Sequence, residues 1–135
     1  MTKKIQDIPL TEIIAEIRRI AAESPDYVYK PVVKPNSLGI GTCEYVERSA
    51  DGELVGSCIV GRALVNLGVP PEVLTFTDDF TPTAFGLLAD LDFDVRGAEI
   101  KWIQRVQSGQ DQKMSWGDAV ARADVLHPAV GEAAK

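Results

Sequence analysis

The sequence has few of the side chains that most often carry catalysis, with one histidine and two cysteines in 135 residues. Because the single histidine, His127, stands beside a proline near the end of the chain, serine or cysteine triads lack a convincing base. Nucleotide-binding glycine loops and a nucleophile elbow are also missing. We therefore expect no cofactor and a function without catalysis. Convergence of distant carboxylates on folding stays open.

Metal ligands are equally scarce. The two cysteines would need two further ligands to hold zinc. Asp90, Asp92 and Asp94 alternate like the first ligands of a calcium loop. Val95 and Lys101 stand where that loop needs a glycine and a bidentate glutamate, so we expect no metal site.

Long apolar runs are absent, since none approaches the roughly 18 residues that span a bilayer. The first residues, Met1–Lys4, lead into an amphipathic segment rather than a signal sequence. We expect a cytoplasmic protein without a membrane partner.

Basic residues are outnumbered, 14 against 20 acidic ones, which gives a net charge of -6. This charge opposes nonspecific attraction to phosphate backbones and anionic lipids. The composition therefore disfavours a general nucleic-acid binder.

What is present is the composition of an ordinary globular protein, 45% hydrophobic and 25% charged. We expect one domain over residues 1–135, mainly α in an α+β arrangement, with about five helices around one buried central helix and a small antiparallel β-hairpin. The helices are expected at about residues 11–23, 58–67, 81–91, 96–107 and 115–124, followed by a frayed tail at 129–135.

The helix at 58–67 is the predicted central one, because only Arg62 and Asn66 are clearly polar in it. Ser57 is the expected N-cap. Gly68 suits the left-handed position that ends a helix, and the two prolines after it prevent continuation.

Thr11 is the expected N-cap of the first helix. Ser115 is the expected N-cap of the last one, with Asp118 completing a capping box. Trp102 and Trp116 lie on apolar stripes of the two C-terminal helices, so core packing between these helices is favoured over an exposed anchor.

Proline and glycine interrupt residues 25–41, which predicts an ordered, extended connection in which Tyr27–Tyr29 form a short edge strand. Cys43–Arg48 is a strand candidate. Asp51–Gly52 predicts a two-residue turn before Leu54–Val55, which would complete the hairpin.

Three stretches together resemble small uncharacterised proteins of actinobacteria and their bacteriophages. They are Cys43-x-Tyr45, Cys58–Leu64 ending in Leu67-Gly68-Val69, and Trp102-x-x-x-Val106-Gln107-x-x-Gln110-Asp111 with Trp116-Gly117-x-Ala119-Val120. The resemblance implies no known reaction. It implies an accessory bacterial or phage protein that acts on other proteins rather than on metabolites.

Cys43 and Cys58 carry the enzymatic alternative, a thiol-dependent enzyme or redox sensor, because a thiol at a helix N-terminus can have a lowered pKa. A two-residue turn would place Arg48 opposite Val55 and Tyr45 opposite Cys58. The two cysteines would then share a sheet face, displaced beyond the Cα separation of about 4.4 to 6.8 Å that a disulfide tolerates. Inert packing is the favoured interpretation.

Residues 96–124 can also be interpreted as a helix-turn-helix with its turn at Ser108–Gly109. The second helix carries Asp118 and Asp124 against Arg122 alone. It would meet phosphates without a favourable charge, so DNA binding is the weakest of the three hypotheses.

The leading hypothesis is a non-enzymatic protein-binding accessory factor, a phage or bacterial protein that engages a host protein. The candidate contact residues are Tyr27 and Tyr29, with Val32 and Val33 in the same connection, and the pair Arg18 and Arg19. Their positions do not identify the partner, and self-association stays open.

Overall fold

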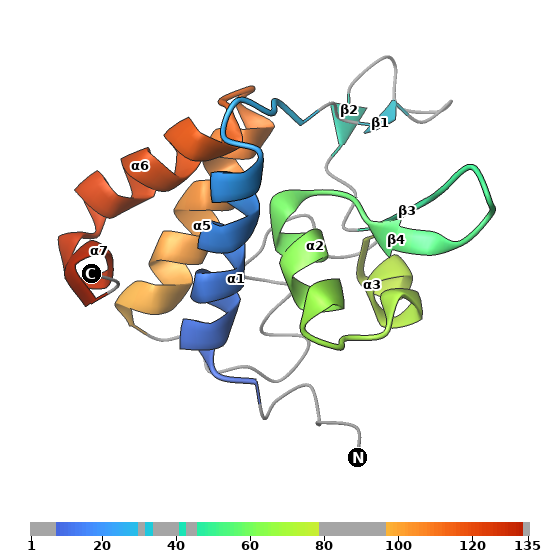
Figure 1. The fold of residues 1–135 in the computed structure, drawn as a ribbon, viewed down its shortest axis with the longest axis horizontal. Coiled ribbons are helices and arrows are strands. Elements are labelled where there is room, and N and C mark those ends of the chain that lie inside the picture. The colour runs from blue at the N-terminus through green and yellow to red at the C-terminus, as the bar shows by residue number, and fades with distance from the viewer. Residues whose placement is uncertain (1–7, 30–31, 34–40, 43–45, 79–96, 134–135) are drawn as a thin grey trace.

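The computed structural model describes residues 8–29, 32–33, 41–42, 46–78 and 97–133 (Figure 1). The predicted helix at 81–91, the Asp90–Asp94 pattern and Cys43 lie outside these residues. The described elements are α1 (Leu10–Glu23), β1 (Val32–Val33), β2 (Gly41–Thr42), β3 (Val46–Arg48), β4 (Leu54–Gly56), α2 (Ile59–Asn66), α3 (Pro71–Asp78), α5 (Ala98–Asp111), α6 (Trp116–Leu126) and α7 (Pro128–Ala133). The mainly helical class is confirmed.

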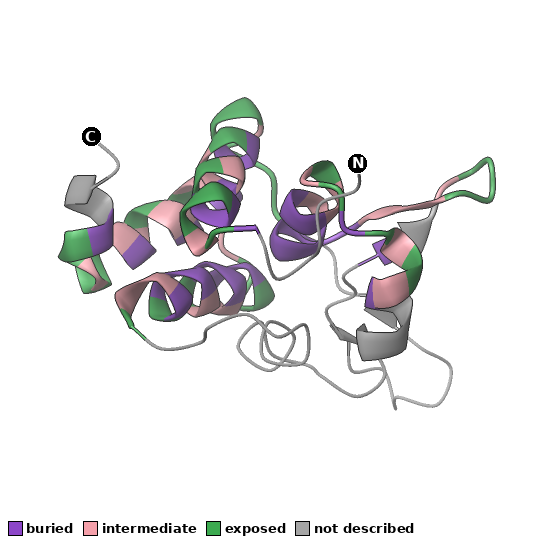
Figure 2. Cartoon of the chain, turned by 90° about the horizontal axis from the view of Figure 1, so that it is seen from below, coloured by how far each residue is buried: buried purple, intermediate pink, exposed green. Residues whose placement is uncertain are grey.

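The helices form two groups with α1 between them (Figure 1). On one side α1 packs against α5 and α6, which in turn hold α7. On the other side it packs against α2, which contacts β4. Exposed residues gather at the tip of the turn between β3 and β4, which projects from the body of the molecule (Figure 2).

Helix α1 buries Ile13, Ile17 and Ile20, which recur at helical spacing. Its predicted N-cap is wrong, because the helix starts one residue before Thr11. Pro9 takes the N-cap position, and its carbonyl accepts the first backbone hydrogen bonds in place of a side-chain cap.

Strands β3 and β4 pair antiparallel, with Arg48 opposite Leu54 and Val46 opposite Gly56. The predicted pairing of Arg48 with Val55 is therefore wrong by one residue. The Ser49 N–H donates to the carbonyl of Glu53, and Gly52 has a φ of 82°. The loop thus has three residues, with glycine in the left-handed position. Strands β1 and β2 pair antiparallel in a second small sheet.

Helix α2 is capped by Cys58, whose Sγ accepts a hydrogen bond from the N–H of Gly61 at 3.4 Å. The predicted cap, Ser57, is wrong, because its hydroxyl lies 3.2 Å from the Tyr29 hydroxyl instead. The helix end follows the prediction. Gly68 has a φ of 102°, and α3 starts at Pro71.

Helix α5 runs through Ser108 and Gly109, where the helix-turn-helix hypothesis placed a turn. A Cβ on Gly109 would lie 3.1 Å from the Cβ of Ala119, so glycine here permits close approach of α6. Ser115 caps α6 as predicted, since its Oγ accepts from the N–H of Asp118 at 3.2 Å. In place of the expected frayed tail, residues 128–133 form α7, and Val130 packs into the core.

Trp102 and Trp116 are fully buried, as the apolar stripes predicted. Each indole N–H has a hydrogen-bond acceptor. Trp102 donates to Asp124 Oδ1 at 2.9 Å, and Trp116 donates to Gln110 Oε1 at 3.1 Å. These bonds satisfy the polar end of each large aromatic residue in the interior.

Candidate binding surface

Cys58 has no solvent exposure, and its Sγ is occupied in capping α2. Its side chain carries no disulfide. A buried thiol cannot reach a substrate without local unfolding. Cys43, its partner in the redox hypothesis, lies outside the described residues.

Arg122, the basic side chain of the second helix of the helix-turn-helix hypothesis, makes contacts within the chain. Arg122 donates to the side-chain oxygen of Gln112 at 3.4 Å and to the carbonyl of Arg105 at 3.3 Å. The geometry therefore lends no support to a phosphate-binding second helix.

Arg18 of α1 contacts residues of both α5 and α6. Its two terminal nitrogens donate to the carboxylate of Asp124 at 2.7 and 3.0 Å. Its guanidinium lies 4.7 Å from the centre of the Trp102 ring. This candidate contact residue thus has a structural role in joining three helices.

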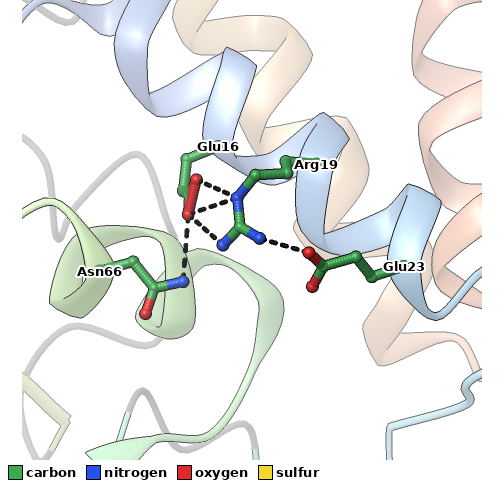
Figure 3. Close-up of polar contacts among 4 residues, drawn as sticks. All are labelled: Glu16, Arg19, Glu23 and Asn66. Carbon is green, nitrogen blue, oxygen red and sulfur yellow. Dashed lines mark hydrogen bonds and ion pairs between the residues drawn. The ribbon is translucent and has the colours of Figure 1, made fainter.

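Arg19 lies on the outer face of α1 in a polar cluster with Glu16, Glu23 and Asn66 (Figure 3). It bonds to Glu16 at 2.6 Å and also contacts Glu23, while the Asn66 amide donates to Glu16 at 3.1 Å. Hydrogen bonds from Arg19 lower the pKa of Glu16 despite its partial burial. The charge of Arg19 is therefore already balanced within the chain.

The two tyrosines of the connection have different environments. Tyr29 is 3% exposed, and its hydroxyl meets Ser57. Tyr27 is 40% exposed and is followed by Val28, 41% exposed. Tyr27 and Val28 are therefore the exposed large hydrophobic residues of this segment, and Pro25 and Asp26 before them are also exposed.

Tyr27 is held in place from two directions. Its ring packs on Trp116 with 4.5 Å between centroids at a tilt of 55°. Its carbonyl accepts from the backbone N–H of Trp116 at 2.9 Å, and Val28 pairs with Ser115. The exposed aromatic is thus fixed to the start of α6.

Arg62 completes this surface from α2. Its guanidinium lies 5.0 Å from the Trp116 ring centre and 5.6 Å from that of Tyr27. Its Nε donates to the carbonyl of Ser57 at 3.1 Å. We call Tyr27, Val28 and Arg62 the Tyr27–Arg62 surface.

Sequence reasoning missed Arg62 as a contact residue. The available signal was a charged residue on an otherwise apolar helix. Its aromatic neighbours could not be inferred, because Tyr27 and Trp116 lie far from it in the chain.

A groove of about 480 Å³ borders this surface and shares Arg62 with it. It lies between the end of α1, strand β4 and the outer side of α2. Arg19 and Glu23 line one part, and apolar Ile20 and Val65 line another. We call it the α1–β4–α2 groove. Its size falls within the usual range for ligand sites, about 300–1,000 Å³.

A second groove of about 430 Å³ lies between α1, α5 and α7. Its lining is mostly apolar, with Ile14, Ala98 and Val130. The nearby cation, Arg18, is paired with Asp124. This groove therefore has less to orient a ligand than the first one.

Among the described residues, no three histidine, cysteine or carboxylate side chains gather to hold a metal ion. None of the helices in the described part of the chain combines the length and apolar character needed to cross a membrane.

Comparisons of the chain with protein-family models, with curated proteins and with solved structures find no match. The resemblance to actinobacterial and phage proteins stays a prediction.

Proposed function

We propose that the chain is a non-enzymatic protein-binding module that contacts its partner through the Tyr27–Arg62 surface. The observation that carries this proposal is an exposed tyrosine fixed on a buried tryptophan, with an arginine over both rings. In keeping with the sequence resemblance, we propose a partner in the cytoplasm of a bacterial host.

The composition of the surface supports binding. Tyrosine, tryptophan and arginine are the residue types most enriched among those that dominate protein interfaces. Tyr27 is already held by Trp116 and by backbone bonds, so a partner would lose little side-chain entropy in ordering it. Val28, the next residue along the chain, is also exposed and apolar.

The proposal takes α2 as the buried helix at the centre of the fold and β3–β4 as a hairpin at its side. In this arrangement α2 presents Arg62, Val65 and Asn66 on its outer side, while its other residues are buried. The surface would then be built on a rigid support, as a specific interface requires.

A selection from random peptides displayed on yeast tests the proposal. Peptides that bind the full chain saturably are measured again against Val28→Glu. Val125→Glu is the matched control, because Val125 is 78% exposed near the far end of α6. Circular dichroism and urea unfolding verify that both variants fold.

We expect Val28→Glu to weaken binding by about tenfold or more, equivalent to about 1.4 kcal/mol, and Val125→Glu to leave it unchanged. Binding that survives Val28→Glu, or that is lost in Val125→Glu alone, contradicts the proposed surface. A selection that yields no saturable binder contradicts the proposed function.

A further inference from the structure

Arg62 has hydrogen-bond donors that the fold does not use. Its Nε is bonded to the Ser57 carbonyl, and its guanidinium is stacked near two rings. In the part of the chain that the structure describes, its two terminal nitrogens have no acceptor. A planar guanidinium with both terminal nitrogens available matches the geometry of a carboxylate.

The charges of the α1–β4–α2 groove favour an anion beside Arg62. Arg19 is balanced by Glu16 and Glu23, with which it forms ion pairs. Arg62, the other cation of the groove's lining, has no ion pair among the described residues. One cation against two carboxylates leaves the cluster around Arg19 negative, so the attraction for an anion is local to the guanidinium of Arg62.

The apolar part of the lining indicates what flanks the anion. Ile20, Leu54 and Val65 line the same groove as Arg62. A phosphate backbone would leave these apolar side chains uncovered. A peptide with a carboxylate next to an apolar residue suits both parts of the lining.

We propose that the α1–β4–α2 groove binds a glutamate or aspartate side chain from a partner protein, with Arg62 as its receptor and an adjacent apolar residue against Ile20 and Val65. This inference rests on the proposed function and names the chemistry of the partner. Because the rings of Tyr27 and Trp116 hold the guanidinium in place, Arg62 is oriented before the carboxylate arrives.

A pair of short peptides tests the inference by nuclear magnetic resonance. The probes are acetyl-Gly-Leu-Glu-Leu-Gly-amide and the same peptide with glutamine in place of glutamate. Each is titrated into the full isotope-labelled chain while the Nε–H signal of Arg62 and the amide signals of Val55 and Val65 are followed.

We expect the glutamate peptide to move these signals saturably and to bind at least about fivefold more tightly than the glutamine peptide. Arg62→Gln removes this preference, and Arg62→Lys reduces it because lysine lacks the planar pair of donors. Arg105→Gln is the control, since Arg105 is an exposed arginine of α5 outside the groove.

Equal affinity for the two peptides, or shifts confined to residues outside the groove, would overturn the inference. A response of the Arg62 signal to inorganic phosphate but not to the glutamate peptide would overturn it too, in favour of a phosphate ligand. If Arg62→Gln does not fold, the comparison of the two peptides on the natural chain and on Arg62→Lys still decides.

The failure of this inference is distinguishable from failure of the proposed function. Selected peptides can lose affinity for Val28→Glu, carry no acidic residue and bind Arg62→Gln unchanged. That result supports the protein-binding module and contradicts the carboxylate site. Conversely, a glutamate preference that needs Arg62 stands even if Val28→Glu has no effect on binding.

Discussion

Gln110 is the residue whose replacement tests most directly how the interior is held together. It is fully buried, and its Oε1 accepts from the backbone N–H of Ile59 at 2.8 Å and from Trp116 Nε1 at 3.1 Å. The Ile59 N–H belongs to the first turn of α2, where backbone donors have no intrahelical acceptor. One side chain of α5 thus satisfies donors from α2 and α6.

Gln110→Leu retains most of the side-chain volume and removes the acceptor. Two buried donors are then left without partners, each at about 1–3 kcal/mol, so the free energy of unfolding should fall by about 2–6 kcal/mol. Against a total of about 5–15 kcal/mol for a typical domain, this is a large fraction. The variant should unfold at a clearly lower urea concentration.

Urea unfolding followed by tryptophan fluorescence measures this change. A double-mutant cycle with Trp116→Phe identifies its cause, because that background has already lost the indole donor. There, Gln110→Leu should cost about 1–3 kcal/mol less than in the natural chain. A loss below about 0.5 kcal/mol, or strict additivity of the two substitutions, would refute the reasoning.

Three other predictions concern packing, thiol access and pH. Gly56→Ala should lower the free energy of unfolding by about 1–3 kcal/mol, because a Cβ there would lie 2.5 Å from the backbone of α2; an unchanged urea midpoint would contradict this packing. In Cys43→Ser, Cys58 should react with a thiol reagent no faster than local unfolding exposes its side chain, because it is fully buried in the folded chain. A reaction rate of the folded chain equal to that of free cysteine would favour the thiol hypothesis instead. Arg19 lowers the pKa of Glu16 in the folded chain. The natural chain should therefore be more stable than Glu16→Gln. This difference in the free energy of unfolding should be complete above the unfolded pKa of about 4.3 and should be lost as the pH falls through the lower folded pKa. Urea unfolding over that pH range measures this difference, and a constant difference would contradict the assigned pair.

Local pattern predicted several elements of the fold because the determining interactions are themselves local. The isoleucines of α1 recur at helical spacing, and Ser115 caps its own helix. Gly68 adopts a positive φ that the sequence indicated. None of these features depends on residues distant in the chain.

Errors arose where a tertiary contact overrode a local preference. Gly109 looked like part of a turn but serves the close approach of Ala119, so the helix continues past it. Ser57 is a good capping residue by type, yet its hydroxyl meets Tyr29 and leaves the cap to Cys58. Such contacts depend on the fold and cannot be inferred from spacing.

The candidate surface was only half predictable for the same reason. The sequence predicts Tyr27 as a contact residue from its place in the extended connection. The guanidinium of Arg62 is positioned by two rings that are distant from it in the sequence, Tyr27 before it and Trp116 after it. A charged residue on an apolar helix was visible in the sequence, whereas its aromatic support required coordinates.

Trp116 joins the interior of the molecule to the proposed binding surface. Its indole N–H is fixed inside by Gln110, and its ring supports Tyr27 and Arg62 outside. Gln110 also accepts a hydrogen bond from the start of α2, the helix that carries Arg62. One buried amide therefore orients both Trp116 and α2, on which the surface is built. The arrangement of the surface residues therefore depends on contacts in the core. A partner that binds this surface would stabilise the packing of α2, α5 and α6 through the same contacts.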